Sequence, residues 1–227
     1  MKKLALALLL LAACAREVDE PDSSTTRPLD DAPTRSTPAP PAVTGPRLPF
    51  VDEAPNDPTF AAYRDQLLAA VRARDTKTLL ALADPHIRTS FGGDGGHASL
   101  TDDHWRALEQ ILPLGGTFRD GMFWAPYVYS AWPESHDAFE SLAVIADNVP
   151  LRASGDANAP AIATLSRDIV KRAGQPGADP GPWTKVTTAD GKTGFVESQY
   201  VRSPVDYRAG FTKTPDGWRM STLVAGD

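Results

Sequence analysis

The first folded part of the chain places apolar residues at helical spacing. A helix is predicted to begin at Asp57-Pro58, because aspartate caps helices and proline suits the first helical position. A second helix should follow a cap at Asp75 and stop at Pro85, and a third should follow the capping-box pattern of Ser99 and Asp102. The apolar residues that set these patterns are Phe60, Tyr63, Leu67, Val71, Leu79, Leu80, Leu82, Trp105, Leu108 and Leu112. Between the second and third helices, "HIRTSF" alternates like a short strand.

From Leu142 the spacing changes to that of strands. Short apolar strands are predicted at 169–170, 183–186 and 194–196, and Asp190-Gly191 is a signal for a two-residue type I′ hairpin turn.

After Ser203, two more alternating runs flank Pro215-Asp216-Gly217 and predict a second hairpin. We expect Trp218, Met220, Thr222 and Val224 to share one face, with Phe211 opposite them. An isolated hairpin is marginally stable, so this one should pack on the helices that carry Leu67, Val71 and Leu80.

These patterns predict an α+β protein. Its expected parts are a helix-rich N-terminal domain with a C-terminal β-hairpin, and a small β-barrel inserted between them. The predicted boundaries are 1–13 for a signal peptide, 14–56 for a tether, 57–140 for the N-terminal α+β domain, 141–203 for the barrel, and 204–227 for the hairpin.

The first fourteen residues predict export. Lys2 and Lys3 precede an apolar run that is too short to span a bilayer, which is typical of a secretory signal. The run ends in Leu-Ala-Ala-Cys, which resembles the bacterial lipobox; a plain secretory peptide is the alternative. The resemblance implies cleavage before Cys14, acylation of this cysteine, and anchoring in the bilayer. Ala15 favours the outer membrane, facing the periplasm, over the inner membrane.

Composition narrows the partners. The net charge is −6, which disfavours nucleic acid as a partner, because binding it requires a basic surface. Cys14 is the only cysteine, which rules out an intramolecular disulfide. Residues 14–56 are rich in Pro, Ser and Thr and have no apolar period, so they are predicted to be a disordered tether. The tether either carries the domain away from its membrane or is an inert spacer.

The segment from Leu142 to Val201 resembles a bacterial SH3 domain. The resemblance rests on Asn148-Val149, the strand that starts at Trp183, the Asp190-Gly191 hairpin, and the closing Gly194-Phe195-Val196 and Tyr200-Val201. It departs from the family pattern at Phe195, where tryptophan is frequent, at Asp168, where a turn glycine is common, and in the long loop 171–182. The resemblance implies a small barrel that binds cell-wall peptide, peptidoglycan or an envelope protein.

Aromatic side chains are the candidate binding residues. Trp183 and Tyr200 are the candidates on the barrel, where Phe195 is expected to be core. In the N-terminal domain, Trp124, Tyr127 and Trp132 either form a platform for sugar faces or belong to the core.

No catalytic or cofactor motif is recognised in the sequence. Residues 92–97 lack the context of a nucleotide-binding loop, and His97 and His104 are not spaced to converge on a metal with Asp102 and Asp103. We therefore expect a non-catalytic protein with no metal and no cofactor. The alternative is a small-ligand receptor or hydrolase-type enzyme with a pocket formed by the N-terminal domain and the C-terminal hairpin.

Overall fold

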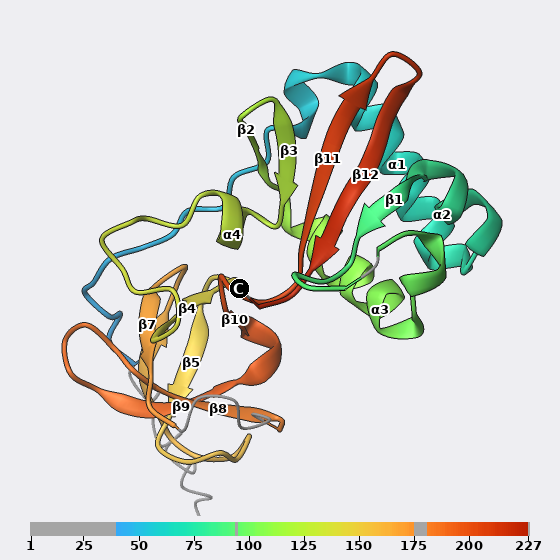
Figure 1. The fold of residues 1–227 in the computed structure, drawn as a ribbon. Coiled ribbons are helices and arrows are strands. Elements are labelled where there is room, and N and C mark those ends of the chain that lie inside the picture. Colours follow the sequence, from blue (N-terminus) through green and yellow to red (C-terminus); the bar gives the residue numbers. More distant parts are fainter. Residues whose placement is uncertain (1–39, 94, 175–180, 227) are drawn as a thin grey trace, which may run out of the picture. The chain divides into compact units, whose positions relative to one another are not determined.

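The computed structural model of the protein describes residues 40–93, 95–174 and 181–226, which form two β-sheets accompanied by helices (Figure 1). The predicted α+β class is confirmed. The predicted signal peptide and Cys14 lie outside the described residues. Within those residues, no helix combines the length and the apolar character needed to cross a membrane.

Two of the three predicted helix starts are confirmed. The carboxylate of Asp57 accepts hydrogen bonds from the N–H groups of Thr59 (2.8 Å) and Phe60 (3.2 Å), and that of Asp75 accepts from the N–H of Thr78 (3.1 Å). These bonds satisfy N–H groups that lack partners at a helix start. The helices of the described residues are α1 (Pro58–Ala73), α2 (Thr76–Leu82), α3 (Asp102–Ile111) and α4 (Tyr127–Ser130), with 3-10 turns η1 (Ala54–Asn56), η2 (His97–Ser99), η3 (Leu112–Leu114) and η4 (Ser198–Tyr200).

The third helix begins differently from the prediction. Its N-cap is Thr101, whose backbone N–H donates to Nδ1 of His104 (3.1 Å) in a capping-box arrangement. Ser99 instead belongs to η2, where its hydroxyl donates to the carbonyl oxygen of Gly96 (2.6 Å). The predicted box of Ser99 and Asp102 is therefore wrong, because the chain makes a separate 3-10 turn before the helix starts.

The five-stranded sheet has the order β1-β12-β11-β3-β2. The hairpin of β11 and β12 forms its centre, with β1 parallel to β12 and β3 antiparallel to β11. Pro85 lies within β1, three residues after α2 has ended at Leu82. The strands are β1 (Ala83–Arg88), β2 (Thr117–Arg119), β3 (Met122–Ala125), β11 (Arg208–Thr214) and β12 (Gly217–Val224).

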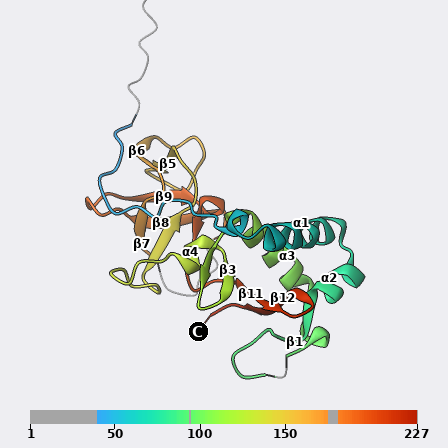
Figure 2. The ribbon, with the colours of Figure 1, turned by 90° about the horizontal axis from the view of Figure 1, so that it is seen from above.

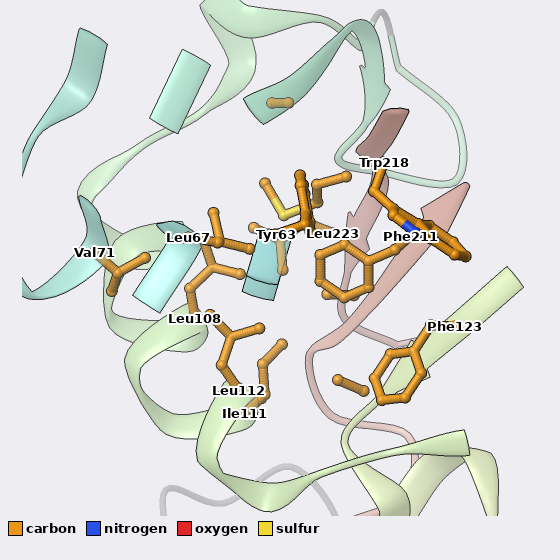
Figure 3. Packing of buried hydrophobic residues seen from close by; sticks show 14 of the residues in the cluster. Tyr63, Leu67, Val71, Leu108, Ile111, Leu112, Phe123, Phe211, Trp218 and Leu223 are labelled. Carbon is orange, nitrogen blue, oxygen red and sulfur yellow. The ribbon is translucent and has the colours of Figure 1, made fainter. Parts of the chain in front are cut away.

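Helices α1 and α3 cover one face of this sheet (Figure 2). Leu67 and Val71 of α1 meet Phe211 and Trp218 of the hairpin in one buried cluster (Figure 3). Within this core, Phe60 is surrounded by the rings of Tyr63, Phe118, Phe123, Phe211 and Trp218.

A β-bulge changes which residues of β12 face this core. Gly210 pairs with Thr222 while Phe211 pairs with Met220, so Ser221 is an extra residue in β12. Beyond the bulge, Leu223 joins the aromatic cluster. The uniform alternation predicted through Thr222 and Val224 is therefore wrong past Met220.

The seven-stranded sheet has the order β10-β4-β7-β8-β9-β5-β6. The predicted range 141–203 encloses all seven strands. No pairing between the described residues joins its edge strands β10 and β6. The strands are β4 (Ser141–Val144), β5 (Val149–Arg152), β6 (Ala161–Leu165), β7 (Ile169–Arg172), β8 (Trp183–Thr187), β9 (Thr193–Glu197) and β10 (Val201–Arg202).

The turn between β8 and β9 is longer than predicted. The N–H of Thr188 donates to the carbonyl oxygen of Lys192 (2.9 Å), and that of Gly191 donates to the carbonyl oxygen of Thr188 (3.0 Å). Only Gly191 has a positive φ (84°) in this turn. The connection is a three-residue loop closed by a left-handed glycine, not a type I′ turn. Asp190 keeps an ordinary φ and accepts a hydrogen bond from the Thr188 hydroxyl (2.5 Å).

Residues 40–56, which composition assigned to the tether, are paired along both sheets. The N–H of Val43 donates to Thr164 (3.0 Å), that of Leu48 to Arg167 (2.8 Å), and that of Glu53 to Gly116 (2.9 Å), each to a carbonyl oxygen. The side chains of Val43 and Leu48 are buried. The predicted boundary at 56 is therefore too late. The segment has a low average hydrophobicity, but two of its apolar residues, Val43 and Leu48, are buried in the fold.

Candidate ligand-binding grooves

Of the three aromatic candidates in the N-terminal domain, only Tyr127 is fully buried. Tyr127 is 0% exposed and lies with Leu48 and Ile169, and burial raises the pKa of its phenol. Its candidate role in binding is corrected to a core role, which was the alternative. Trp124 is half-buried: its ring lies over Gly210, where an added Cβ would approach it to 2.7 Å. The Trp124 ring therefore covers part of the surface of the five-stranded sheet.

Trp132 is the candidate that lines a groove. It is half-buried, and its Nε1 donates to the carbonyl oxygen of His136 (2.9 Å). Tyr129, Phe139 and Arg208 line the same cavity of about 540 Å³. Phe139 is 58% exposed, so part of the apolar lining is open to solvent.

The two barrel candidates have different surroundings. Trp183 is half-buried on the side of β8 opposite to the inward-facing Thr184 and Val186, and it packs against Gly155. Tyr200 packs against the aliphatic core of the seven-stranded sheet. Both stay half-buried.

Phe195 was expected to be core and is not. It is half-buried on β9, opposite Lys185 of β8, whose ammonium lies 5.9 Å from the centre of its ring. Gly194 and Val196 are the buried residues on either side of it. Phe195 therefore shares the outward face with Lys185 and Trp183.

Three adjoining cavities follow the connection from β10 to β11, and we call them together the connection groove. The first cavity (about 490 Å³) and the second (about 550 Å³) share Arg172 and Ser203, while the second and the third (about 540 Å³) share Phe139 and Val205. The shared lining residues make the three cavities neighbours along one path.

The connection groove is basic, although the chain is acidic. Its cations outnumber its carboxylates, five to three, whereas the whole chain has 23 basic and 29 acidic residues. The cationic residues are Arg119, Lys171, Arg172, Arg202 and Arg208, and the acidic ones are Glu134, Glu140 and Asp206. A local excess of cations favours anionic ligands.

Arg208 is held between aromatic rings. Its guanidinium carbon lies 4.8 Å from the ring centre of Tyr129 and 5.3 Å from that of Phe91, and its Nη1 donates to the carbonyl oxygen of Gly226 (2.6 Å). Stacking of this kind orders the cation. It therefore gives the third cavity a fixed positive wall beside Trp132.

The first cavity contains a buried arginine. The side chain of Arg202 is 8% exposed; its Nη2 donates to the carbonyl oxygen of Tyr207 (3.0 Å) and lies 3.4 Å from the carboxylate of Asp206. Its Nε has no hydrogen-bond partner in the described part of the chain. Burial lowers the pKa of this guanidinium below its ordinary value, and Asp206 opposes that effect.

A separate cavity lies between α1 and the hairpin, where the alternative function expected a pocket. It measures about 520 Å³. The Tyr63 hydroxyl donates to the carbonyl oxygen of Leu82 (2.8 Å), and Nε1 of Trp218 donates to the Thr59 hydroxyl (3.1 Å). Both donors already bond to protein acceptors. Fewer polar groups therefore remain available to bind a ligand here than in the first cavity of the connection groove.

The basic residues of the connection groove are absent from the sequence-based candidates. They come from β2, β7, β10 and β11, and only Lys171 and Arg172 are adjacent in the chain. No spacing rule links such positions before the strand order is known. No group of three or more His, Cys, Asp and Glu suited to a metal occurs among residues 40–93, 95–174 and 181–226.

No protein-family model matches the chain, and no curated protein matches its sequence.

Proposed function

We propose that this protein is an exported, lipid-anchored protein of the cell envelope that binds cell-wall peptide beside an SH3-like barrel formed by residues 141–203. The observation that carries the proposal is the connection groove, which gathers basic and aromatic side chains in an otherwise acidic chain. Strands β4, β7 and β10 of the proposed barrel each contribute to its lining.

The chemistry of the groove suits wall peptide. Stem peptides of the wall are extended chains with free carboxylates, and arginine recognises carboxylates through paired N–H donors. Extended peptides bind in aromatic-lined grooves of small β-domains. Trp132 and Phe139 offer ring faces for the apolar and sugar parts of such a ligand.

The strand pairing supports the SH3-like assignment of residues 141–203. Strands β4, β7, β8, β9 and β5 are successive antiparallel neighbours. Successive antiparallel strands of this kind are the building pattern of small β-barrels. The outward face that bears Trp183 and Phe195 is a second place on the same sheet where a ligand could bind.

The lipid anchor rests on the Leu-Ala-Ala-Cys sequence that ends at Cys14. The variant Cys14→Ser should move the protein from the membrane fraction to the soluble fraction, or leave it with an uncleaved signal. Fractionation with mass spectrometry of the N-terminus measures both outcomes. Equal membrane retention and unchanged processing would exclude the lipobox.

Retention on purified peptidoglycan sacculi tests the binding function. The full-length protein in mild detergent is incubated with sacculi, and the double variant Arg119→Glu with Lys171→Glu reverses two exposed charges of the groove. We expect roughly tenfold weaker retention, because charge-assisted contacts are lost. Arg72→Glu with Lys77→Glu is the matched control, since both residues are exposed and lie in or beside helices far along the chain from the groove.

The results separate the possible sites. Loss in the groove variant alone supports the connection groove. Loss only in Trp183→Ala would move the site to the outward face of β8 and β9. Absence of retention for the unmodified protein would exclude the proposed function.

A further inference from the structure

The first cavity of the connection groove combines a buried cation with neutral donors. Arg202 lies in its wall, nine-tenths buried, with Nε unpartnered. The hydroxyls of Thr184 and Ser198, 2.9 Å apart, line the same cavity. Gln110 of α3 stands at its edge as an exposed amide.

The charge of Arg202 is only partly balanced by the protein. Asp206 approaches Nη2 to 3.4 Å, but its side chain is 45% exposed, so solvent weakens the pair. Arg172 lines the cavity as well, and its side chain makes no ion pair or hydrogen bond to another described residue. A buried arginine that keeps a free donor is satisfied best by an anionic acceptor.

The remaining lining limits the kind of anion. Leu114, Leu142, Ile145 and Val201 form an apolar wall around the polar groups. A planar carboxylate matches the fork of a guanidinium, and small apolar groups attached to it match the wall. A free, highly hydrated anion would leave the apolar wall without a partner.

We propose that the first cavity binds the C-terminal carboxylate of a short peptide whose last residues have small apolar side chains, with Arg202 as the carboxylate-binding residue. This inference rests on the proposed function and makes it more specific, because cell-wall stem peptides end in D-alanine with a free carboxylate. In this arrangement, the guanidinium of Arg202 donates to the carboxylate, and the ligand competes with Asp206 for the guanidinium.

The test uses a peptide whose only charge is its C-terminal carboxylate. Diacetyl-L-lysyl-D-alanyl-D-alanine and its C-terminal amide are titrated into the full-length protein in mild detergent by calorimetry. We expect the acid to bind at least about tenfold more tightly than the amide, since the amide cannot form the charge-assisted bonds.

Gln110→Glu and Asp206→Asn report on the cavity without replacing a buried residue, and Arg202→Lys tests the buried cation itself. Gln110→Glu places a negative charge at its edge and should weaken binding of the acid, while Gln66→Glu, the same change at an exposed position of α1, should not. Asp206→Asn removes the competing carboxylate and should strengthen binding of the acid several-fold but not that of the amide. Arg202→Lys keeps the charge, loses the planar fork, and should weaken the preference for the acid.

The outcomes distinguish this inference from the proposed function. Equal binding of acid and amide, or an unchanged affinity in Gln110→Glu and Asp206→Asn, would overturn the carboxylate site. Retention on sacculi without binding of either soluble peptide would overturn it too and leave wall binding intact. Failure of both assays would exclude the proposed function as well.

Discussion

The two sheets of this protein fill their cores with different side chains. Over the five-stranded sheet, Phe60 meets Phe123 (4.2 Å between ring centres), Trp218 (4.9 Å) and Phe211 (5.4 Å). The buried core of the seven-stranded sheet is entirely aliphatic, made of valine, leucine and alanine. An aromatic residue therefore indicates a core position in the five-stranded sheet but not in the seven-stranded sheet.

In the first region an aromatic residue usually belongs to the core, as Phe60 and Phe123 do. In the second region, Trp183 and Phe195 lie on the outward face of their strands, because the inward positions hold Val186 and Val196. Aromatic crowding along a sequence is therefore weak evidence for a binding surface. The position of each ring in the strand alternation is stronger evidence.

Removal of the hairpin should have the largest effect and should separate the two regions. Truncation after Ser203 deletes β11 and β12, which are the only strands that link β1 to β3 in the five-stranded sheet as described. We expect residues 60–82 to lose protection from hydrogen exchange, because Phe211, Trp218 and Met220 leave their core. Residues 186–196, which lie in the other sheet, should stay protected.

The opposite pattern would break the comparison. Loss of protection in residues 186–196 with 60–82 retained would mean that the hairpin supports the seven-stranded sheet instead. Loss in both regions would mean that the two cores fold as one cooperative unit. Full-length protein, labelled in parallel, is the reference.

A pair of aromatic truncations sharpens the comparison. Phe60→Ala should cost about 3–5 kcal/mol of unfolding free energy, because the ring is fully buried among other rings. Trp183→Ala should cost roughly 1 kcal/mol or less, because the larger Trp183 ring is half-buried on an outward face. Urea denaturation followed by circular dichroism measures both.

The ranking of the two variants is the decisive result. Equal losses of stability would show that Trp183 is a core residue and would remove it from the candidate binding residues. A full loss of peptidoglycan retention by Trp183→Ala with unchanged stability would favour the outward face over the connection groove.

Helices and hairpins were predicted well where residues close in the sequence determine the local structure. Asp57 and Asp75 cap their helices because a carboxylate satisfies free N–H groups next to it in sequence. The tail hairpin was also predicted from its alternation and its Pro-Asp-Gly turn. The errors occur where the structure depends on residues that are distant in the sequence. The bulge at Ser221 depends on pairing with β11, and the burial of Val43 depends on packing against a sheet formed by later residues.

The connection groove could not be predicted in the same way. Arg119, Arg172 and Arg202 are separated by 53 and 30 residues in the chain (172 − 119 and 202 − 172), and they come together only through the order of the strands. Trp132 was identified because aromatic residues are conspicuous, whereas isolated arginines are not. Long-range topology is the information that the sequence patterns lack.

The smallest predicted effect is a pH dependence confined to the helical region. Burial lowers the pKa of His104 below its ordinary value of 6.5, although Asp103 opposes the shift, and Nδ1 accepts the N–H of Thr101 (3.1 Å). A group whose folded-state pKa is lowered stabilises the fold above its unfolded pKa, and this contribution is lost as the pH falls through the folded-state pKa. Protonation would remove the acceptor at Nδ1 and place a cation at the positive end of α3.

The variant His104→Gln isolates this contribution, because glutamine at the same position can accept the capping hydrogen bond but does not titrate. From pH 7.5 to pH 5, the unmodified protein should lose more stability than His104→Gln, as measured by urea midpoints for both at each pH. His86, His97 and His136 are present in both proteins, so any contribution from them cancels in the difference. Parallel loss of stability in the two proteins would show that the Thr101–His104 cap does not depend on the charge of the imidazole. A midpoint of His104→Gln that is lower than that of the unmodified protein by the same amount at both pH values would report the lost packing of the imidazole against Tyr207, 5.7 Å away between ring centres.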